Sequence, residues 1–150
     1  MTNMIDEKDK KILKELRSNS RQTTKSISEK IKIPRVTVHE RIQKMVEKGV
    51  IKKFTAIPDF SKTGQPFIAF IFLKLEKIPK VSQRVVGRKV AKIPGIFEIH
   101  VVAGEHDLLL KARGESLAEM SNLIIDKLRE IEGVSNTFTM AVFETIKEEA

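Results

Sequence analysis

The sequence predicts an α+β protein made of an N-terminal winged helix-turn-helix and a C-terminal ferredoxin-like βαββαβ domain. Three observations predict this fold class. Residues 1–53 show three short helical patterns and then an apolar run, residues 67–146 alternate strand and helix patterns, and Pro58, Gly64 and Pro66 mark the stretch between them. We therefore expect domains over residues 1–55 and 67–150, joined by a linker over 56–66.

Each helix of the first domain has a start or stop signal. Asp6 can cap the first helix, and Thr23 or Thr24 can cap the second. Pro34 favours the start of a third helix, and Gly49 is suited to end it. The predicted elements are helices over residues 5–16, 24–31 and 34–48, and a short wing strand over 50–55.

The second domain is predicted from its order of elements. They are strand 67–75, helix 80–92, strands 97–103 and 107–113, helix 116–131 and strand 134–146. A short internal repeat supports two βαβ halves, because IPGI at 93–96 and IEGV at 131–134 each lead from a helix into a strand. This order is the ferredoxin-like pattern.

The net positive charge is confined to the first domain. The chain has 150 residues and a net charge of +8. Residues 1–53 hold 15 Lys and Arg against 7 Asp and Glu, whereas the remaining residues hold 13 of each. A basic first domain on a neutral body indicates a polyanion partner for that domain alone, and the alternative is an ordinary solvated lysine-rich surface.

Composition excludes several classes of function. The chain has no cysteine, so it has no disulfide, thiolate metal site or cysteine nucleophile. It has no P-loop, dinucleotide-binding glycine motif or zinc-protease motif, and adjacent His106 and Asp107 would point apart in a turn. We expect neither an enzyme nor a cofactor. No apolar run approaches the ~20 residues of a membrane span, and no signal peptide is evident, so we expect a cytoplasmic protein that binds no membrane.

The third helix is the expected reading element for double-stranded DNA. Steps of about 100° per residue place Val38, Ile42, Met45 and Val46 on its buried side. Candidate base contacts come from the N-terminal half of the helix, where such helices read base edges: Val36, Thr37, His39 and Glu40. Candidate phosphate contacts are the nearby cations Arg21, Lys25, Arg35, Arg41 and Lys44, with Lys52 and Lys53 on the wing.

Alternatives to this interpretation differ in strength. Ordinary helix surface is the alternative for every one of these residues, and for His39 alone it is the stronger reading. RNA is disfavoured because no aromatic residue precedes Phe54 to stack on bases.

The strand over 67–75 is apolar on both faces. A sheet with helices on one side would leave its other face wet, so this strand indicates that the second face is covered. A second copy of the domain is the simplest cover and would give a dimer, whereas the N-terminal domain is the alternative cover.

The turn at 104–107 is a candidate ligand site. Gly104 permits a sharp bend, backbone N–H groups there could hold a carboxylate, and Asp107 could pair with an ammonium group. Thr137 and Thr139 point to one face of the last strand. From these residues alone a plain hairpin turn and routine strand threonines are the slightly preferred reading.

Four segments resemble the leucine-responsive and asparagine-activator (Lrp/AsnC) family. They are IDEKDKKILKEL, RVTVHERIQKMVEKGVIKKFTA, VAGEHDLLLKARG and EIEGVSNTFTMAVFETIKE. The resemblance implies a homo-oligomeric transcription regulator, with dimers commonly joined into octamers and an amino acid bound between dimers. Carried over by position, the ligand residues are Gly104, Glu105, His106 and Asp107 of one subunit, with Thr137 and Thr139 from a neighbour. An architectural protein that coats DNA without an effector is the competing hypothesis.

Overall fold

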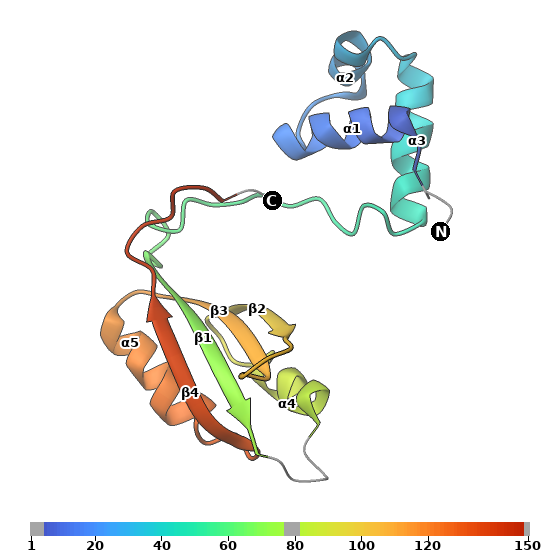
Figure 1. The fold of residues 1–150 in the computed structure, drawn as a ribbon. Coiled ribbons are helices and arrows are strands. Elements are labelled where there is room, and N and C mark those ends of the chain that lie inside the picture. Colours follow the sequence, from blue (N-terminus) through green and yellow to red (C-terminus); the bar gives the residue numbers. More distant parts are fainter. Residues whose placement is uncertain (1–4, 77–81, 149–150) are drawn as a thin grey trace. The chain divides into compact units, whose positions relative to one another are not determined.

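The computed structural model describes residues 5–76 and 82–148 and divides the chain into two compact units. The N-terminal unit is Met1–Ile57 and the C-terminal unit is Pro58–Glu149 (Figure 1). Within the described ranges, no helix is both long enough and apolar enough to cross a membrane.

Three helices form the N-terminal unit: α1 (Glu7–Ser18), α2 (Thr24–Ile31) and α3 (Arg35–Glu47). The predicted caps are confirmed. The Asp6 carboxylate accepts a hydrogen bond from the Asp9 N–H at 2.9 Å, and the Asp9 carboxylate accepts one from the Asp6 N–H at 3.0 Å. Thr23 rather than Thr24 caps α2, since its hydroxyl accepts from the Ser26 N–H. The reciprocal bonds between Asp6 and Asp9 set the start of α1.

A small apolar core holds the three helices together. Its buried members are Ile12, Ile27, Ile33, Val38 and Met45. Gly49 follows α3 with φ 68°, in the left-handed region that glycine adopts easily, as predicted for the residue that ends this helix.

The predicted wing strand over 50–55 is wrong. The backbone from Lys52 to Ile57 forms neither helix nor strand, because a strand needs a neighbouring backbone to bond with and the described part of the N-terminal unit offers none. This segment and the end of α1 line an apolar groove of about 1040 Å³, and Phe54 and Ile57 stay exposed.

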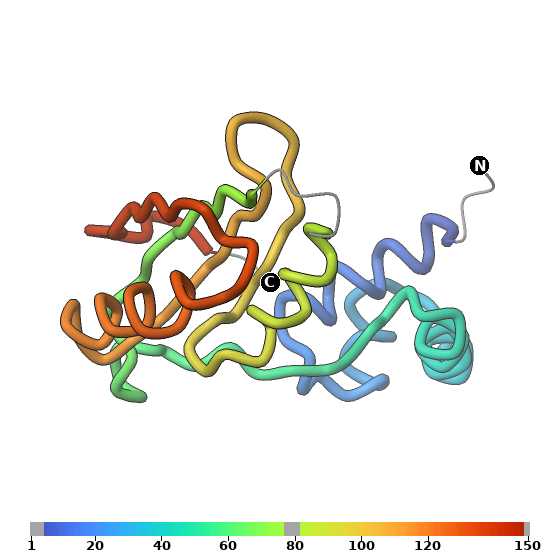
Figure 2. Tube along the Cα trace, turned by 90° about the horizontal axis from the view of Figure 1, so that it is seen from below, coloured from blue at the N-terminus to red at the C-terminus, as the bar shows by residue number. Residues whose placement is uncertain are grey.

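The C-terminal unit is an antiparallel sheet with helices on one face. Its elements are β1 (Phe67–Leu75), α4 (Gln83–Val90), β2 (Ile96–Val101), β3 (Leu108–Gly114), α5 (Leu117–Asn122), a π-helical turn η1 (Leu123–Leu128) and β4 (Val134–Ala141). The strand order is β2-β3-β1-β4, the ferredoxin-like order that the sequence predicts. Figure 2 shows α4 next to the continuous helical segment formed by α5 and η1.

The two faces of the sheet differ in cover. On β1, the side chains of Ala69, Ile71, Leu73 and Leu75 are buried in the core beneath the helices. The intervening Phe70 and Phe72 face the other side and are only half-buried. We call this other side the open face. β4 adds Phe138 and Met140 to it, because these residues pair with Phe72 and Phe70.

Three element boundaries depart from the predictions by three residues or more. The helix predicted over 80–92 spans only Gln83–Val90, and residues 80 and 81 lie outside the described residues. The helix predicted over 116–131 changes from α to π geometry at Leu123. The strand predicted over 134–146 ends at Ala141, whose partner is Ala69 of β1, and only one further backbone bond between described residues follows, from the Val142 N–H to the Ile68 carbonyl.

Candidate functional site

The N-terminal half of α3 presents the predicted DNA-reading side chains to solvent. Val36, His39 and Glu40 are exposed, and 68% of Val36 is accessible although it is apolar. Thr37 is half-buried. Val38, one residue further, is fully buried in the core, which fixes the rotation of the helix. The predicted separation of an exposed side from a packing side is therefore present, except that Val46, predicted to pack, is 41% exposed.

Arg35 connects the starts of α2 and α3. Its Nε lies 3.3 Å from the hydroxyl of Thr24, the first residue of α2. Arg21 and Lys25 flank that helix start and are exposed, and Lys25 lies 4.0 Å from Glu29. The fold thus brings three of the predicted phosphate contacts to the N-terminus of α2, where a helix favours anions.

Arg41 lies in a different environment. Its guanidinium donates to Asp6 at 2.7 Å and to Asp9 at 2.8 Å, and its side chain is only 25% exposed. These two carboxylates, Asp9 first, raise the pKa of Arg41. The pKa of Asp6 is lowered by the Asp9 N–H and then by Arg41. Arg41 therefore fastens α3 to the capped start of α1, a contact that the sequence pattern did not indicate.

Lys44 completes the predicted cations of α3. It is exposed one turn after Glu40. Lys52 and Lys53 are exposed on the segment that follows. These residues are open to a phosphate group, in contrast to Arg41.

The turn at 104–107 is held by Asp107. Its carboxylate accepts from the Leu75 N–H at 2.8 Å and from the Gln83 side-chain amide at 2.7 Å. These donors, Leu75 first and Gln83 second, hold the pKa of Asp107 below its ordinary value. Asp107 therefore joins β3 to the end of β1 and to the first residue of α4.

The other turn residues are more open. Gly104 has φ 135°, a region that side chains other than glycine rarely adopt, and Glu105 is exposed beside it. The His106 ring is half-buried and lies 5.1 Å from the Phe72 ring and 6.3 Å from the Phe138 ring. His106 thus adds an imidazole ring to the aromatic side chains of the open face.

Thr137 and Thr139 lie on the opposite side of the sheet from this aromatic cluster. They pair with Leu73 and Ile71, whose side chains are in the helix-covered core. Arg129 Nε donates to the Thr137 hydroxyl at 3.2 Å, and Thr139 is exposed. Within one chain the two threonines and His106 therefore face away from each other across β4.

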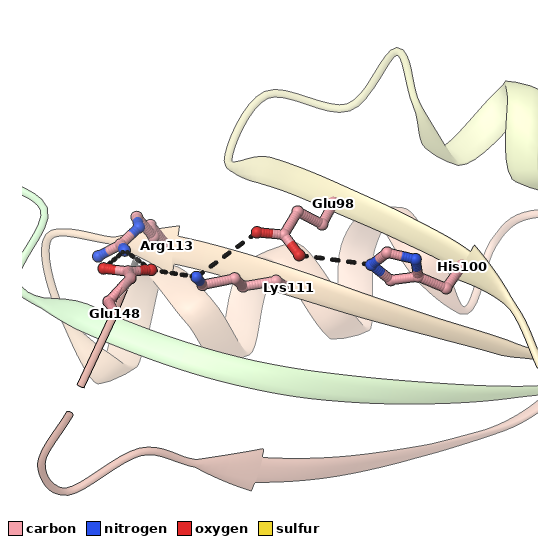
Figure 3. Close-up of polar contacts among 5 residues, drawn as sticks. All are labelled: Glu98, His100, Lys111, Arg113 and Glu148. Carbon is pink, nitrogen blue, oxygen red and sulfur yellow. Dashed lines mark hydrogen bonds and ion pairs between the residues drawn. The ribbon is translucent and has the colours of Figure 1, made fainter. Parts of the chain in front are cut away.

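A polar network on the open face is a feature that the sequence analysis missed. Figure 3 shows it running from His100 through Glu98 and Lys111 to Glu148 and Arg113. The sequence does contain a signal for this network. Charged or polar residues occur two apart at 98 and 100 and at 111 and 113, and residues two apart on a strand point to the same face of the sheet. The network lies on the sheet face opposite the helices, next to the apolar side chains that β1 and β4 place on the same face.

Arg113 is the buried end of this network. It is 6% exposed, and its guanidinium carbon lies 3.9 Å from the centre of the Phe60 ring. Phe60 in turn meets the Phe97 ring edge-on at 5.4 Å. The planar charge is thus stacked on an aromatic ring and paired with a carboxylate, which offsets its loss of water.

Two family descriptions match the two units. Residues 5–52 match a winged helix-turn-helix DNA-binding domain, and residues 68–150 match the Lrp/AsnC ligand binding domain. The chain belongs to the Lrp/AsnC family. This Lrp/AsnC protein is accordingly a DNA-binding transcription regulator with a ligand-binding domain, and not an enzyme.

Named relatives agree over nearly the whole length. The chain is 45% identical to the HTH-type transcriptional regulator PH1916 of Pyrococcus horikoshii, over 99% of each chain. It is 40% identical to the HTH-type transcriptional regulator FL11 of the same organism, over 96% of this chain and 93% of that one. Among solved structures, the transcriptional regulator NMB0573 of Neisseria meningitidis, in complex with L-Met, superposes with a TM-score of 0.90 at 24% identity, over 97% and 94% of the two chains.

Proposed function

We propose that this Lrp/AsnC regulator reads specific DNA sequences with the N-terminal half of α3 and that a small amino acid tunes its assembly or DNA binding. The observation that carries the DNA part is the exposure of Val36, His39 and Glu40 beside a buried Val38. An apolar side chain left exposed at the start of a recognition helix suits a thymine methyl group, and Glu40 can accept from cytosine.

Phosphate contacts in this proposal come from the exposed cations. Arg21, Lys25 and Arg35 at the start of α2, with Lys44, Lys52 and Lys53, would hold the duplex in register. Thr37, half-buried, would make a minor base contact. Arg41 serves chiefly to position α3, since its guanidinium already bonds to Asp6 and Asp9.

The effector is proposed to be an amino acid. Support comes from the ligand-binding domain itself and from the L-Met complex of NMB0573. Gly104, Glu105, His106 and Asp107 would line the site from one subunit. Thr137 and Thr139 would come from a neighbour, and such a division suits their positions on opposite sides of β4. In this arrangement Asp107 acts mainly by shaping the turn.

The open face is the proposed dimer interface. Phe70, Phe72, Phe138 and Met140 give it an apolar half that no element of the described C-terminal unit covers. A second copy would cover it symmetrically and provide two DNA-reading helices for a palindromic site. Dimers that join further, up to an octamer, would then set the spacing of these helices. A cytoplasmic location is also part of the proposal.

The mechanism is linkage between the ligand and the assembly. An amino acid that bridges subunits favours one assembly, and it can shift the equilibrium only by its preference for that assembly over others. That assembly in turn fixes where the DNA-reading units can bind.

Two experiments test the proposal. Competition binding against random-sequence DNA should give a specificity ratio of at least ~10³, whereas an architectural protein would show little preference. A thermal-stability screen against the twenty amino acids should find at least one that raises the melting temperature by mass action. Thr139→Val should reduce that rise, and Thr145→Val, the same change on an exposed residue outside the site, should leave it intact. No rise with any amino acid would contradict the effector part.

A further inference from the structure

Helix α4 and the turn after it form a purely cationic surface on a unit that has no net charge. Residues 82–92 contain four cations and no carboxylate, although residues 54–150 hold equal numbers of the two. All four cations are exposed, while Val86 and Val90 of the same helix are buried in the core. The cations are Arg84, Arg88, Lys89 and Lys92.

Three of these cations recur every fourth residue. On a helix this spacing puts Arg84 and Arg88 on one side, about 6 Å apart along the axis, and Lys92 follows in the turn after α4. We call Arg84, Arg88 and Lys92 the α4 stripe. Across residues 5–76 and 82–148, no carboxylate forms an ion pair with any member of the stripe, and Lys89 beside it lies 3.9 Å from Glu132.

The stripe is unfavourable for the helix that bears it. Like charges four residues apart destabilise a helix, and a cation in the first turn opposes the helix dipole. The last-turn position of Arg88 and Lys89 suits the helix dipole and offsets part of this cost, but α4 has only eight residues, contains Gly87 and lacks a side-chain bond at its Ser82 cap. An anionic partner along the stripe would remove the repulsion.

We propose that the α4 stripe is a second DNA contact, which binds backbone phosphates of double-stranded DNA without reading bases. Double-stranded DNA carries about one negative charge per 1.7 Å of axis, so it can face all three cations at once. The N-terminal unit holds DNA on the same chain, which raises the local concentration of phosphate near the stripe. The inference uses the DNA binding of the family but is independent of the amino-acid effector.

An acidic surface on a second copy is the competing occupant. Residues 115–132 carry five carboxylates, on and around α5 and η1. Lys127 and Arg129 interrupt them, and Glu119 already accepts from the Glu115 N–H at 2.6 Å. A surface of mixed sign matches the unbroken stripe less well than a phosphate backbone does.

The test compares full-length R84A/R88A with the charge-preserving control R84K/R88K on a random-sequence duplex. Affinity is measured over a range of salt concentrations. Loss of two phosphate contacts per chain should make the negative slope of log K against log salt shallower by about 2 for each chain that contacts the duplex, and it should weaken binding at low salt by roughly tenfold or more. The lysine control should keep the parental slope. Circular dichroism and sedimentation at the same salt concentrations establish that fold and assembly are unchanged.

Three results would overturn the proposal. One is an unchanged slope for R84A/R88A with unchanged assembly. The second is altered sedimentation of R84A/R88A with an unchanged salt slope. The third is a shallower salt slope that is accompanied by loss of assembly. Both of these results would assign the stripe to a contact between protein chains. Glu40→Ala separates these outcomes from failure of the reading helix. It removes a proposed base contact and should lower the preference for specific over random DNA, whereas the α4 variant should retain that preference.

Discussion

The carboxylate of Glu148 accepts two hydrogen bonds from Nη2 of Arg113, each 3.1 Å long. Lys111 also donates to Glu148 (Figure 3). This contact brings the segment after β4 back across the sheet to β3. It leaves Phe143 and Ile146 of that segment fully or almost fully exposed, so the segment is held by its charge and not by its apolar side chains.

Glu148→Gln should destabilise the C-terminal unit by about 1–2 kcal/mol. The buried Arg113 would lose its charged partner, but Glu148 is about one-third exposed and water replaces part of the interaction. Hydrogen exchange of the β3 amides measures this unit by itself. Glu144→Gln, the same change on an exposed carboxylate of the segment, is the control and should have little effect.

The Glu148 contact should also depend on pH. Lys111 foremost, with Arg113, lowers the folded-state pKa of Glu148 below its ordinary value of 4.5. A lowered pKa gives stability that is present above the unfolded-state pKa and is lost as the pH falls through the folded-state pKa. Between pH 5 and 2 the parent should therefore lose more stability than Glu148→Gln. Parallel curves would contradict this assignment.

Asp107→Asn should weaken the hydrogen bonds that hold the start of β3 to the end of β1 and to the start of α4. An asparagine oxygen can still accept from one donor, but its amide group then faces the other and leaves an unpaired donor. The expected loss is about 1–2 kcal/mol, read from the thermal unfolding of the C-terminal unit. Asp126→Asn on the exposed side of η1 provides a matched control. If the two variants were equally stable, the turn would not depend on Asp107.

Arg41→Ala and Lys44→Ala should affect different properties. Arg41→Ala should lower the stability of the N-terminal unit, since Asp6 and Asp9 would lose their shared partner, and it should leave the salt dependence of DNA binding nearly unchanged. Lys44→Ala should leave stability unchanged and lower the salt slope by about 1. A lowered slope for Arg41→Ala would instead support the sequence-based prediction that Arg41 contacts phosphate.

Phe138→Glu should abolish the proposed dimer. Phe138 is 53% exposed on the open face, so a carboxylate there leaves the isolated chain folded but places a charge in an apolar contact. Ile125→Glu is the matched control, because Ile125 is equally exposed on the helix-covered side. Sedimentation velocity should show a monomer only for Phe138→Glu. A dimer that persists in this variant would move the interface away from the open face.

Local signals in the sequence predict most of this fold. Strand β1 has the predicted bounds because it is an apolar run that follows Pro66, and Asp6 and Thr23 cap their helices because capping depends on residues three positions apart. The wing strand failed for the opposite reason. Its residues favour extended backbone, but a strand also needs a partner, and no local pattern reveals whether one is present.

The candidate site was less accessible to sequence reasoning. Exposure of the α3 reading side follows from helical periodicity, which is local. The Arg41 contact to Asp6 spans 35 positions, and so does that of Arg113 to Glu148, and each depends on how separate elements pack. The sequence therefore predicted which side of α3 is exposed, but it did not distinguish Arg41, which is engaged within the fold, from Lys44, which is open to solvent.

The position of β4 in the sheet has a consequence for synthesis on the ribosome. β1 is the first strand of the C-terminal unit to be made, yet one of its two neighbours in the sheet is β4, the last. At translation rates of roughly 5–20 residues per second, β1 waits several seconds with one edge unpaired. The three-helix unit before it can fold during that interval. A nascent chain thus has its DNA-reading helix before it can form the sheet through which copies would associate.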